Sequence, residues 1–204
     1  MPTRGPSTET KGGPVRHRDS RPLPADRLLD TAAALFDREG IRAVGIERLI
    51  AEADVARASL YQAFGSKDAL VVAYVERADR TDRERYARAV RALAEDPRER
   101  IAAFFRLAAA GIRRRRFRGC LYINAATEFP DPDHPVHDAV AAHRDWQRAE
   151  LVRAAGQAGA ADPERLGTRL QLLYDGALVG AKALRDTGPI EEAAELAVEL
   201  LASG

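Results

Sequence analysis

The chain has 204 residues, of which 46% are hydrophobic and 31% charged, and its formal net charge at pH 7 is +1. These proportions are typical of a globular protein of one to two domains, and they exclude a wholly disordered chain. Charged residues interrupt every apolar run, so we expect no membrane span. No apolar leader indicates a secretory signal, and a single cysteine excludes an intrachain disulfide. We therefore expect a cytoplasmic protein.

The first 21 residues are rich in Pro, Gly, Ser and Thr and carry five basic against two acidic side chains. Such a segment does not fold alone, so we expect residues 1–21 to form a disordered basic arm. Arg16, Arg18 and Arg21 lie next to the folded part of the chain and are candidates for contacts with phosphate groups. For residues 1–15 we favour a disordered leader without a role in binding.

The rest of the chain predicts an all-α fold, because Ala, Leu, Arg and Glu dominate and no alternating apolar–polar stretch indicates a strand. A first helix is expected from Pro24 to Gly40, where apolar residues at helical spacing form one stripe. That stripe consists of Leu28, Ala32, Leu35 and Phe36. Two short helices follow, over residues 46–53 and 57–64, and a long helix then runs from about Lys67 to about Ala94.

The two short helices, joined by Asp54-Val55-Ala56 behind a longer helix, have the spacing of a helix-turn-helix. The residues expected to pack between them are Leu49, Ile50, Ala53, Val55, Leu60 and Phe64. The residues expected to face outward are Arg57, Ala58, Ser59, Tyr61 and Gln62. Arg and Gln can read base edges, Ser and Tyr can bond phosphate oxygens, and a small Ala allows close approach to the groove. Spacing and composition alone also fit other helical proteins that contain short helix pairs.

The segment from Ala53 to Leu70 reads ADVARASLYQAFGSKDAL and resembles the signature of the tetracycline-repressor (TetR) family of bacterial transcription regulators. That signature has an Ala-Gly-Val turn, a Ser-x-x-Thr-Leu-Tyr recognition helix and a Phe-x-Ser-Lys-Glu-x-Leu continuation. Asp54 replaces the usual turn glycine, Ala56 replaces the usual serine, and Gly45 stands where a threonine often caps the first short helix. The resemblance covers about residues 22–75.

The resemblance implies an N-terminal three-helix helix-turn-helix domain over residues 22–75, a C-terminal helical effector-binding and dimerisation domain over 76–204, about nine helices and a homodimer. It places Tyr61 and Lys67 at the usual phosphate contacts, the latter at a helix N-terminus that favours anions. Arg57 and Gln62 are favoured for base edges because they offer several hydrogen bonds. The alternatives are that Tyr61 packs under the Phe64 ring and that Lys67 is only a solvated helix start. The DNA-facing candidates are Gly45, Arg57, Ala58, Ser59, Tyr61, Gln62 and Lys67, with Arg16, Arg18 and Arg21.

Helix caps and prolines divide the remaining chain. Asp96-Pro97 predicts the start of a helix that ends in Arg113–Arg116, and a short helix is expected from Cys120 to about Glu128. Three prolines exclude a helix over residues 129–135. Helices are then expected over 136–156, from Asp162-Pro163 to about Thr187, and over 190–202.

The last two predicted helices carry small and apolar residues at helical spacing, which allow close contact with another helix. We expect them to form a homodimer interface, as the TetR resemblance implies, with the alternative that they pack within their own chain. A two-fold dimer spaces two recognition helices about 34–36 Å apart. The interface candidates are Leu173, Gly176, Ala177, Gly180, Ala181, Leu184, Ala194, Ala197, Val198 and Leu201.

The segment from Cys120 to Phe129 places Asn124 and Glu128 on one helical face, next to a proline-rich loop. A few polar groups among apolar walls are typical of a small-molecule pocket. The alternative is that Asn124 and Glu128 form structural bonds with nearby arginines. The effector-site candidates are Phe104, Phe105, Leu107, Cys120, Asn124, Glu128, Trp146 and Tyr174.

Other chemistries are less well supported by the sequence. The histidines and aspartates of residues 131–143 could bind a metal, but their pattern fits a rigid proline-rich loop equally well. Cys120 is more typical of a small core residue than of a redox sensor. No phosphate-binding loop, nucleophile elbow or zinc-protease motif occurs, so we expect neither a cofactor nor an enzyme. The predicted function is an operator-binding homodimeric repressor released by a small-molecule effector. The alternative is a helical small-molecule sensor whose DNA binding is vestigial.

Overall fold

The computed structural model describes residues 22–91, 93, 96–114 and 118–203. Within these ranges the chain forms nine helices and no strand, which confirms the predicted all-α fold. The helices are α1 (Pro24–Glu39), α2 (Ile46–Ala53), α3 (Arg57–Phe64), α4 (Lys67–Arg91), α5 (Pro97–Arg114), α6 (Leu121–Glu128), α7 (Val136–Gln157), α8 (Pro163–Leu184) and α9 (Gly188–Ser203). None of the described helices combines the length and the apolar composition that crossing a membrane requires.

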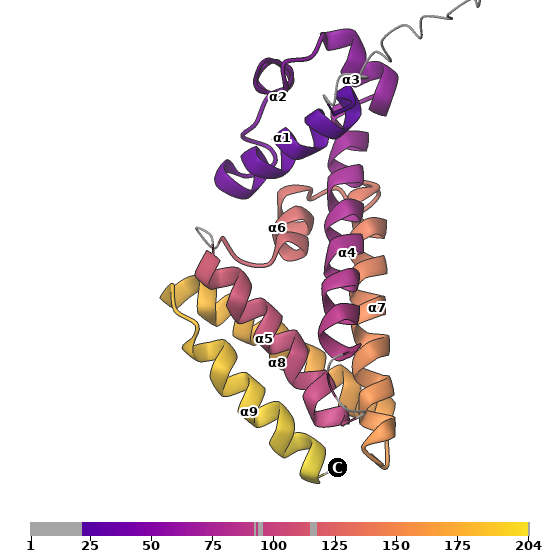
Figure 1. Ribbon diagram of the computed structural model, residues 1–204, viewed down its shortest axis with the longest axis vertical. Coiled ribbons are helices and arrows are strands. Elements are labelled where there is room, and N and C mark those ends of the chain that lie inside the picture. Colours follow the sequence, from indigo (N-terminus) through magenta and orange to yellow (C-terminus); the bar gives the residue numbers. More distant parts are fainter. Residues whose placement is uncertain (1–21, 92, 94–95, 115–117, 204) are drawn as a thin grey trace, which may run out of the picture.

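The helices fall into two groups connected by α4 (Figure 1). Helices α1, α2 and α3 cluster at one end, and α5, α8 and α9 pack together at the other. Helix α4 runs from the first group to the second beside α7, and α6 lies between the groups. The long α4 therefore carries the three small N-terminal helices on its first turns.

Helix ends follow their capping residues. Gly40, with φ of +99°, ends α1, and the Asp162 carboxylate caps α8 by accepting a bond from the Arg165 N–H at 3.0 Å. The eighth helix ends at Leu184, earlier than expected, because Arg185 adopts a left-handed conformation. The ninth begins at Gly188, because Pro189 is compatible with a first helical turn.

Two apolar clusters hold the helices together. One joins buried residues of α1 to α4 with Tyr122 and Ala125 of α6 and with Val136 and Val140 of α7. The other joins α4, α5, α7, α8 and α9, and Cys120 packs against both. The two predicted domains, 22–75 and 76–204, therefore share an apolar cluster, and α6 belongs to the same cluster as the helix-turn-helix.

Candidate DNA-binding surface and effector cavity

Helix α3 is anchored by Leu60, with Phe64 packed against the same cluster, and presents most of its other side chains to solvent. Leu60 is fully buried in the N-terminal cluster, whereas Arg57, Ala58 and Gln62 are exposed and Ser59 is half-buried. The Tyr61 side chain is 43% exposed, so its ring is not enclosed beneath Phe64. The outward set predicted from the sequence therefore lies on one accessible helix surface, with Ser59 at its edge.

The guanidinium of Arg57 forms an ion pair with the carboxylate of Glu47 on α2. The two side chains are 56% and 71% exposed. An exposed ion pair contributes about 0–1 kcal/mol. Arg57 can therefore leave Glu47 for a guanine edge at little cost.

The turn between α2 and α3 keeps its shape without the family's usual glycine. Asp54 adopts the left-handed conformation, with φ of 51° and ψ of 55°, which aspartate tolerates better than most residues. Arg27 of α1 stabilises the end of α2, because its Nε donates to the Ala53 carbonyl at 3.1 Å and its Nη2 to the Asp54 carbonyl at 2.5 Å. Gly45 precedes α2 in extended conformation and supplies no side-chain cap.

Lys67 is directed toward the loop between α1 and α2. Its Nζ donates to the Ile41 carbonyl at 3.1 Å, and burial lowers the pKa of the ammonium. The N-terminal turn of α4 is capped instead by Ser66, whose Oγ accepts from the Ala69 N–H at 3.0 Å. A phosphate contact by Lys67 therefore requires its ammonium to leave Ile41. Arg16, Arg18 and Arg21 lie outside the described residues.

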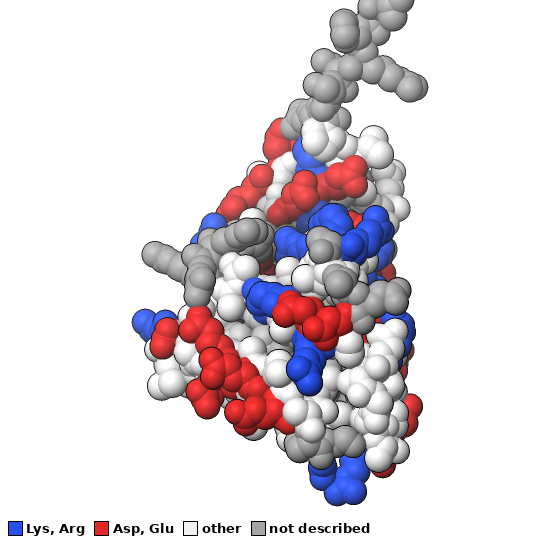
Figure 2. All heavy atoms as spheres, turned by 60° about the horizontal axis from the view of Figure 1, so that its bottom comes forward, with Lys and Arg blue, Asp and Glu red and all other residues white. Residues whose placement is uncertain are grey.

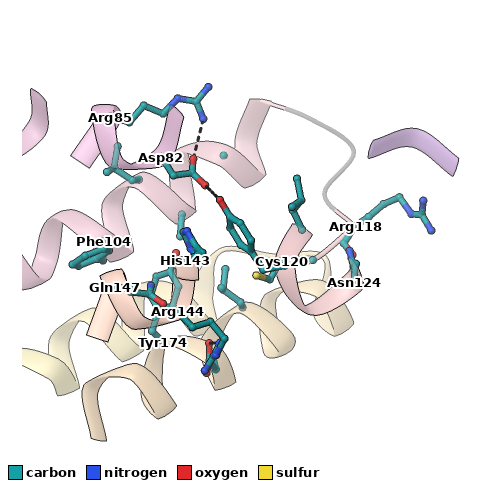
Figure 3. Close-up of a pocket in the computed structure, with 18 of the residues that line it drawn as sticks. Asp82, Arg85, Phe104, Arg118, Cys120, Asn124, His143, Arg144, Gln147 and Tyr174 are labelled. Atoms are coloured by element: carbon teal, nitrogen blue, oxygen red, sulfur yellow. Dashed lines mark hydrogen bonds and ion pairs between the residues drawn. The ribbon is translucent and has the colours of Figure 1, made fainter. Parts of the chain in front are cut away.

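A cavity of about 660 Å³ lies among α4, α5, α6, α7 and α8, and the end of α1 contributes to its lining (Figure 3). Seven of the eight predicted effector residues line it: Phe104, Leu107, Cys120, Asn124, Glu128, Trp146 and Tyr174. The eighth, Phe105, does not, because it is only 1% exposed and packs in the C-terminal cluster. The region named from the sequence is thus a real cavity, and Phe105 belongs to the core.

Aromatic rings form one wall of this cavity. Tyr86 stacks on Phe104 with ring centroids 4.1 Å apart, and Trp146 meets both rings edge-on at 5.8 Å. Tyr174 approaches Phe104 at 6.3 Å from α8. Tyr86 is absent from the predicted set, since a tyrosine in the highly charged second half of α4 gives no sequence signal for a cavity.

The cavity also holds two acid-containing pairs that the sequence did not indicate. The Tyr122 hydroxyl donates to Asp82 Oδ2 at 2.8 Å, and His143 Nδ1 lies 2.8 Å from Asp79 Oδ1. The rings of Tyr122 and His143 stack at 3.5 Å. Burial raises the pKa of Asp82 and lowers that of His143. Asp79 and Asp82 resemble any other acids on a charged helix, so only the packing of α6 and α7 against α4 identifies them.

The polar residues predicted on α6 are already engaged in structural bonds. Asn124 donates to the Arg118 carbonyl at 2.9 Å and accepts from Lys182 Nζ at 3.0 Å. Glu128 Oε2 accepts from the backbone N–H of Arg42 at 2.7 Å. The alternative of structural bonding thus applies to both residues, although the partners are not only arginine side chains. Glu128 connects the cavity to the α1–α2 loop.

Cys120 and the loop histidines have structural surroundings. Burial raises the pKa of the Cys120 thiol, which disfavours the thiolate that a redox sensor needs. His134 stacks on Phe129 at 4.1 Å, and His137 Nε2 lies 2.9 Å from the Phe129 carbonyl. Across the described ranges, no three metal-ligating side chains gather into a group.

Several predicted interface residues are core residues of the subunit. Ala177, Ala181, Ala197 and Leu201 are at most 7% exposed and pack in the chain's own C-terminal cluster. Leu173 and Ala194 pack against the same cluster, and Val198 and Gly180 are half-buried. Only Gly176 and Leu184 of the set are exposed. The pattern of small residues could not separate the helix face toward α9 from the face toward solvent.

Asp175, which stands among these small residues, binds within the chain. The Arg144 guanidinium donates to its two carboxylate oxygens at 3.0 and 2.5 Å. This bidentate pair fixes α7 to α8 beside the cavity.

Two family models match the chain. Residues 28–74 match the model of bacterial regulatory proteins of the tetR family, and residues 97–197 match a tetracyclin repressor-like C-terminal domain. A TetR-family transcriptional regulator from Streptomyces coelicolor, SCO4454, is 41% identical, covers 88% of this chain and 95% of its own, and superposes with a TM-score of 0.79. The chain belongs to the TetR family. A TetR transcriptional regulator from Streptomyces avermitilis is 31% identical over 89% of this chain and 99% of its own, with a TM-score of 0.73.

Curated relatives match over a shorter region. The HTH-type transcriptional regulator Rv1255c of Mycobacterium tuberculosis is 41% identical over 58 residues, which are 28% of this chain and 29% of that protein. This chain thus spans less than a third of that relative's length. The family consists of DNA-binding transcriptional regulators, in agreement with the prediction of a regulator and not an enzyme.

Proposed function

We propose that this TetR-family regulator is a cytoplasmic repressor that binds a palindromic operator as a homodimer and releases it when a small molecule enters the cavity. The observation that carries the proposal is the accessible surface of α3. Arg57, Tyr61 and Gln62 project from the solvent-facing side of a helix whose fully buried anchor is Leu60, which leaves that side free to enter a major groove.

The exposed face of α8 supports the homodimer. Leu172, Gly176, Val179 and Ala183 are exposed at successive spacings of four, three and four residues, which is one continuous stripe along a helix. A Cβ added at Gly176 would meet no atom within 4 Å, so a second helix could approach closely there. Leu172 and Val179 are 65% and 55% exposed, unusual values for large apolar side chains.

The charges that flank this stripe are complementary between the last two helices. Helix α9 carries four glutamates and no basic residue, and Figure 2 shows acidic side chains gathered over it. Exposed basic residues on α8 include Arg165 and Arg169. In a two-fold pair, α8 of one subunit can face α9 of the other with opposite charges opposed.

Helix α6 provides the path from the cavity to the DNA-binding helices. Glu128 both lines the cavity and bonds the Arg42 N–H, and Tyr122 packs in the cluster that holds α1 to α4. A ligand that displaces α6 therefore displaces α4 and the attached α3. A coupling of about 1–3 kcal/mol between ligand and operator is typical of such switches.

The test starts with DNA fragments that the full-length protein retains from a random pool. Fluorescence anisotropy should give a dissociation constant of roughly 10⁻⁸ M or tighter for a palindromic fragment, with affinity falling steeply as salt rises. Equal affinity for selected and random duplexes would contradict the proposal and favour a sensor with vestigial DNA binding.

The dimer is tested by Val179→Asp, which places a charge in the middle of the α8 stripe. Light scattering should report twice the monomer mass of 22.3 kDa for the wild type and the monomer mass for the variant. Leu23→Asp is the matched control, because Leu23 is 69% exposed at the start of α1, and it should remain dimeric. A Val179→Asp protein that stays dimeric would exclude this interface.

A further inference from the structure

One carboxylate in the cavity keeps an oxygen available for a ligand. Asp82 Oδ2 accepts the Tyr122 hydroxyl, while Oδ1 has Arg85 Nη1 3.6 Å away, which is beyond hydrogen-bond distance (Figure 3). Within the described part of the chain, Oδ1 accepts no hydrogen bond. The Asp82 side chain is 41% exposed although packed residues surround it, so it is reached from the cavity.

His143 supplies a second hydrogen-bond acceptor. Asp79 Oδ2 accepts from Arg83 Nε at 2.7 Å, and its Oδ1 lies 2.8 Å from His143 Nδ1. A carboxylate held by arginine requires the proton of a neutral imidazole to be on Nδ1, so the lone pair is on Nε2. Burial lowers the pKa of His143 and keeps the ring neutral near pH 7. His143 Nε2 has no hydrogen-bond partner among the residues that the structure describes.

The aromatic wall adds to the preference for positive charge. Tyr86, Phe104, Trp146 and Tyr174 all line the cavity, and their ring faces carry negative quadrupole charge. A cation over such a ring gains roughly 0.5–2 kcal/mol, the larger value where water is excluded. The same rings would accept the apolar body of a ligand.

The described arginines around the cavity differ in how firmly they are paired. Arg144 binds both carboxylate oxygens of Asp175, and Arg88 Nη1 lies 3.7 Å from a Glu84 carboxylate oxygen. Arg118 Nη1 donates to the Phe36 carbonyl at 3.5 Å. Arg85 is 54% exposed and only loosely paired with Asp82, so a ligand cation could replace it there. At Arg144, an anionic ligand would instead have to break the bidentate pair with Asp175.

We propose that the effector is an organic cation, a protonated amine on an aromatic or apolar body, whose ammonium N–H groups bind Asp82 Oδ1 and whose body lies against the Tyr86–Phe104–Trp146 wall. This inference rests on the proposed function, because it assigns a ligand class to the same cavity. Burial raises the pKa of Asp82, and a bound ammonium would offset that effect by supplying the missing counter-charge. His143 offers a second acceptor to the same ligand class.

The test compares three probes that share one skeleton and differ in charge: 4-phenylbutylamine, 4-phenylbutan-1-ol and 4-phenylbutyrate. Their binding to DNA-free full-length protein at pH 7 is measured by isothermal titration calorimetry. The amine should bind at least about tenfold tighter than the alcohol, and the carboxylate should bind most weakly. An alcohol or a carboxylate that binds as tightly as the amine would overturn the proposal, as would the absence of binding by all three.

The variant Asp82→Asn isolates the contribution of the Asp82 charge to binding from that of the other cavity residues. It should lower affinity for the amine by about tenfold and leave affinity for the alcohol within about twofold. Glu76→Gln, which removes an exposed carboxylate of α4 outside the cavity lining, is the matched control and should change neither value. An unchanged amine-to-alcohol ratio in Asp82→Asn would overturn the assignment of Asp82.

These measurements contain no DNA, so their outcome is independent of the proposed switch. If the amine is preferred and operator affinity does not respond to it, the ligand class stands and the repressor mechanism fails. If the operator is bound and released by another molecule while the amine shows no preference, the repressor stands and the ligand class fails.

Discussion

The proposed DNA-binding surface of α3 and the proposed effector cavity are built in opposite ways. The surface of α3 comes from eight consecutive residues, and a single fully buried side chain, Leu60, anchors them. The cavity takes its lining from six helices, and its polar groups meet only because α6 and α7 pack on α4. The α3 surface should tolerate substitution of its exposed side chains and depend on Leu60. The cavity should depend on contacts between helices that are distant in the sequence.

The largest effect should follow removal of the α3 anchor. Leu60→Ala deletes a fully buried side chain and should lower the free energy of unfolding by about 2–5 kcal/mol, measured by urea denaturation. Tyr61→Ala, on the same helix but 43% exposed, is the control and should change stability by no more than about 0.5–1 kcal/mol. Similar losses in the two variants would show that Leu60 is not the main anchor of α3.

A smaller effect, confined to binding, is expected from the outward side chains. Arg57→Ala should reduce affinity for the selected operator by roughly 1–3 kcal/mol and relax specificity at the contacted base pair. Arg48→Ala is the matched control, because Glu39 and Glu52 hold Arg48 on α2, away from the recognition helix. If both variants show the wild-type base preference in competition binding, Arg57 does not read the sequence.

One bond that connects the cavity to the α1–α2 loop can be broken by Glu128→Ala. The Arg42 N–H then loses its carboxylate acceptor, and a net loss of about 1 kcal/mol corresponds to about fivefold faster amide hydrogen exchange at Arg42. Thr127→Ala is the control, since that hydroxyl donates only within α6, to Ile123. Unchanged exchange at Arg42 would mean that α6 does not restrain the α1–α2 loop through Glu128.

The smallest effect is a pH dependence that originates in the cavity. Burial lowers the pKa of His143 in the folded state, so below about pH 6.5 the unfolded chain binds more protons than the folded one. The free energy of unfolding should therefore fall as the pH decreases through this range, and His143→Gln should flatten the decrease. Urea titrations with unchanged m-values would show that both proteins expose the same surface. Identical pH profiles would contradict a buried neutral imidazole.

The same contrast explains what the sequence could reveal. Helix periodicity and caps gave α1, α2 and α3 correctly, because stripes and turns are local. The alanines of α8 and α9 were assigned to a dimer interface although Ala177, Ala181 and Ala197 are core residues, because small residues suit an intrachain contact equally well. Asp82 and His143 could not be found, because their meeting across α4 and α7 depends on tertiary packing.

The shared core around α6 has a practical consequence for dissecting the protein. A fragment that stops at residue 75 would uncover the side chains of α1 and α4 that Tyr122 and Val136 now cover. The truncated protein would expose an apolar patch and would tend to aggregate. Chimaeras that exchange C-terminal domains between regulators should therefore keep α6 and the first turns of α7 together with helices α1 to α4.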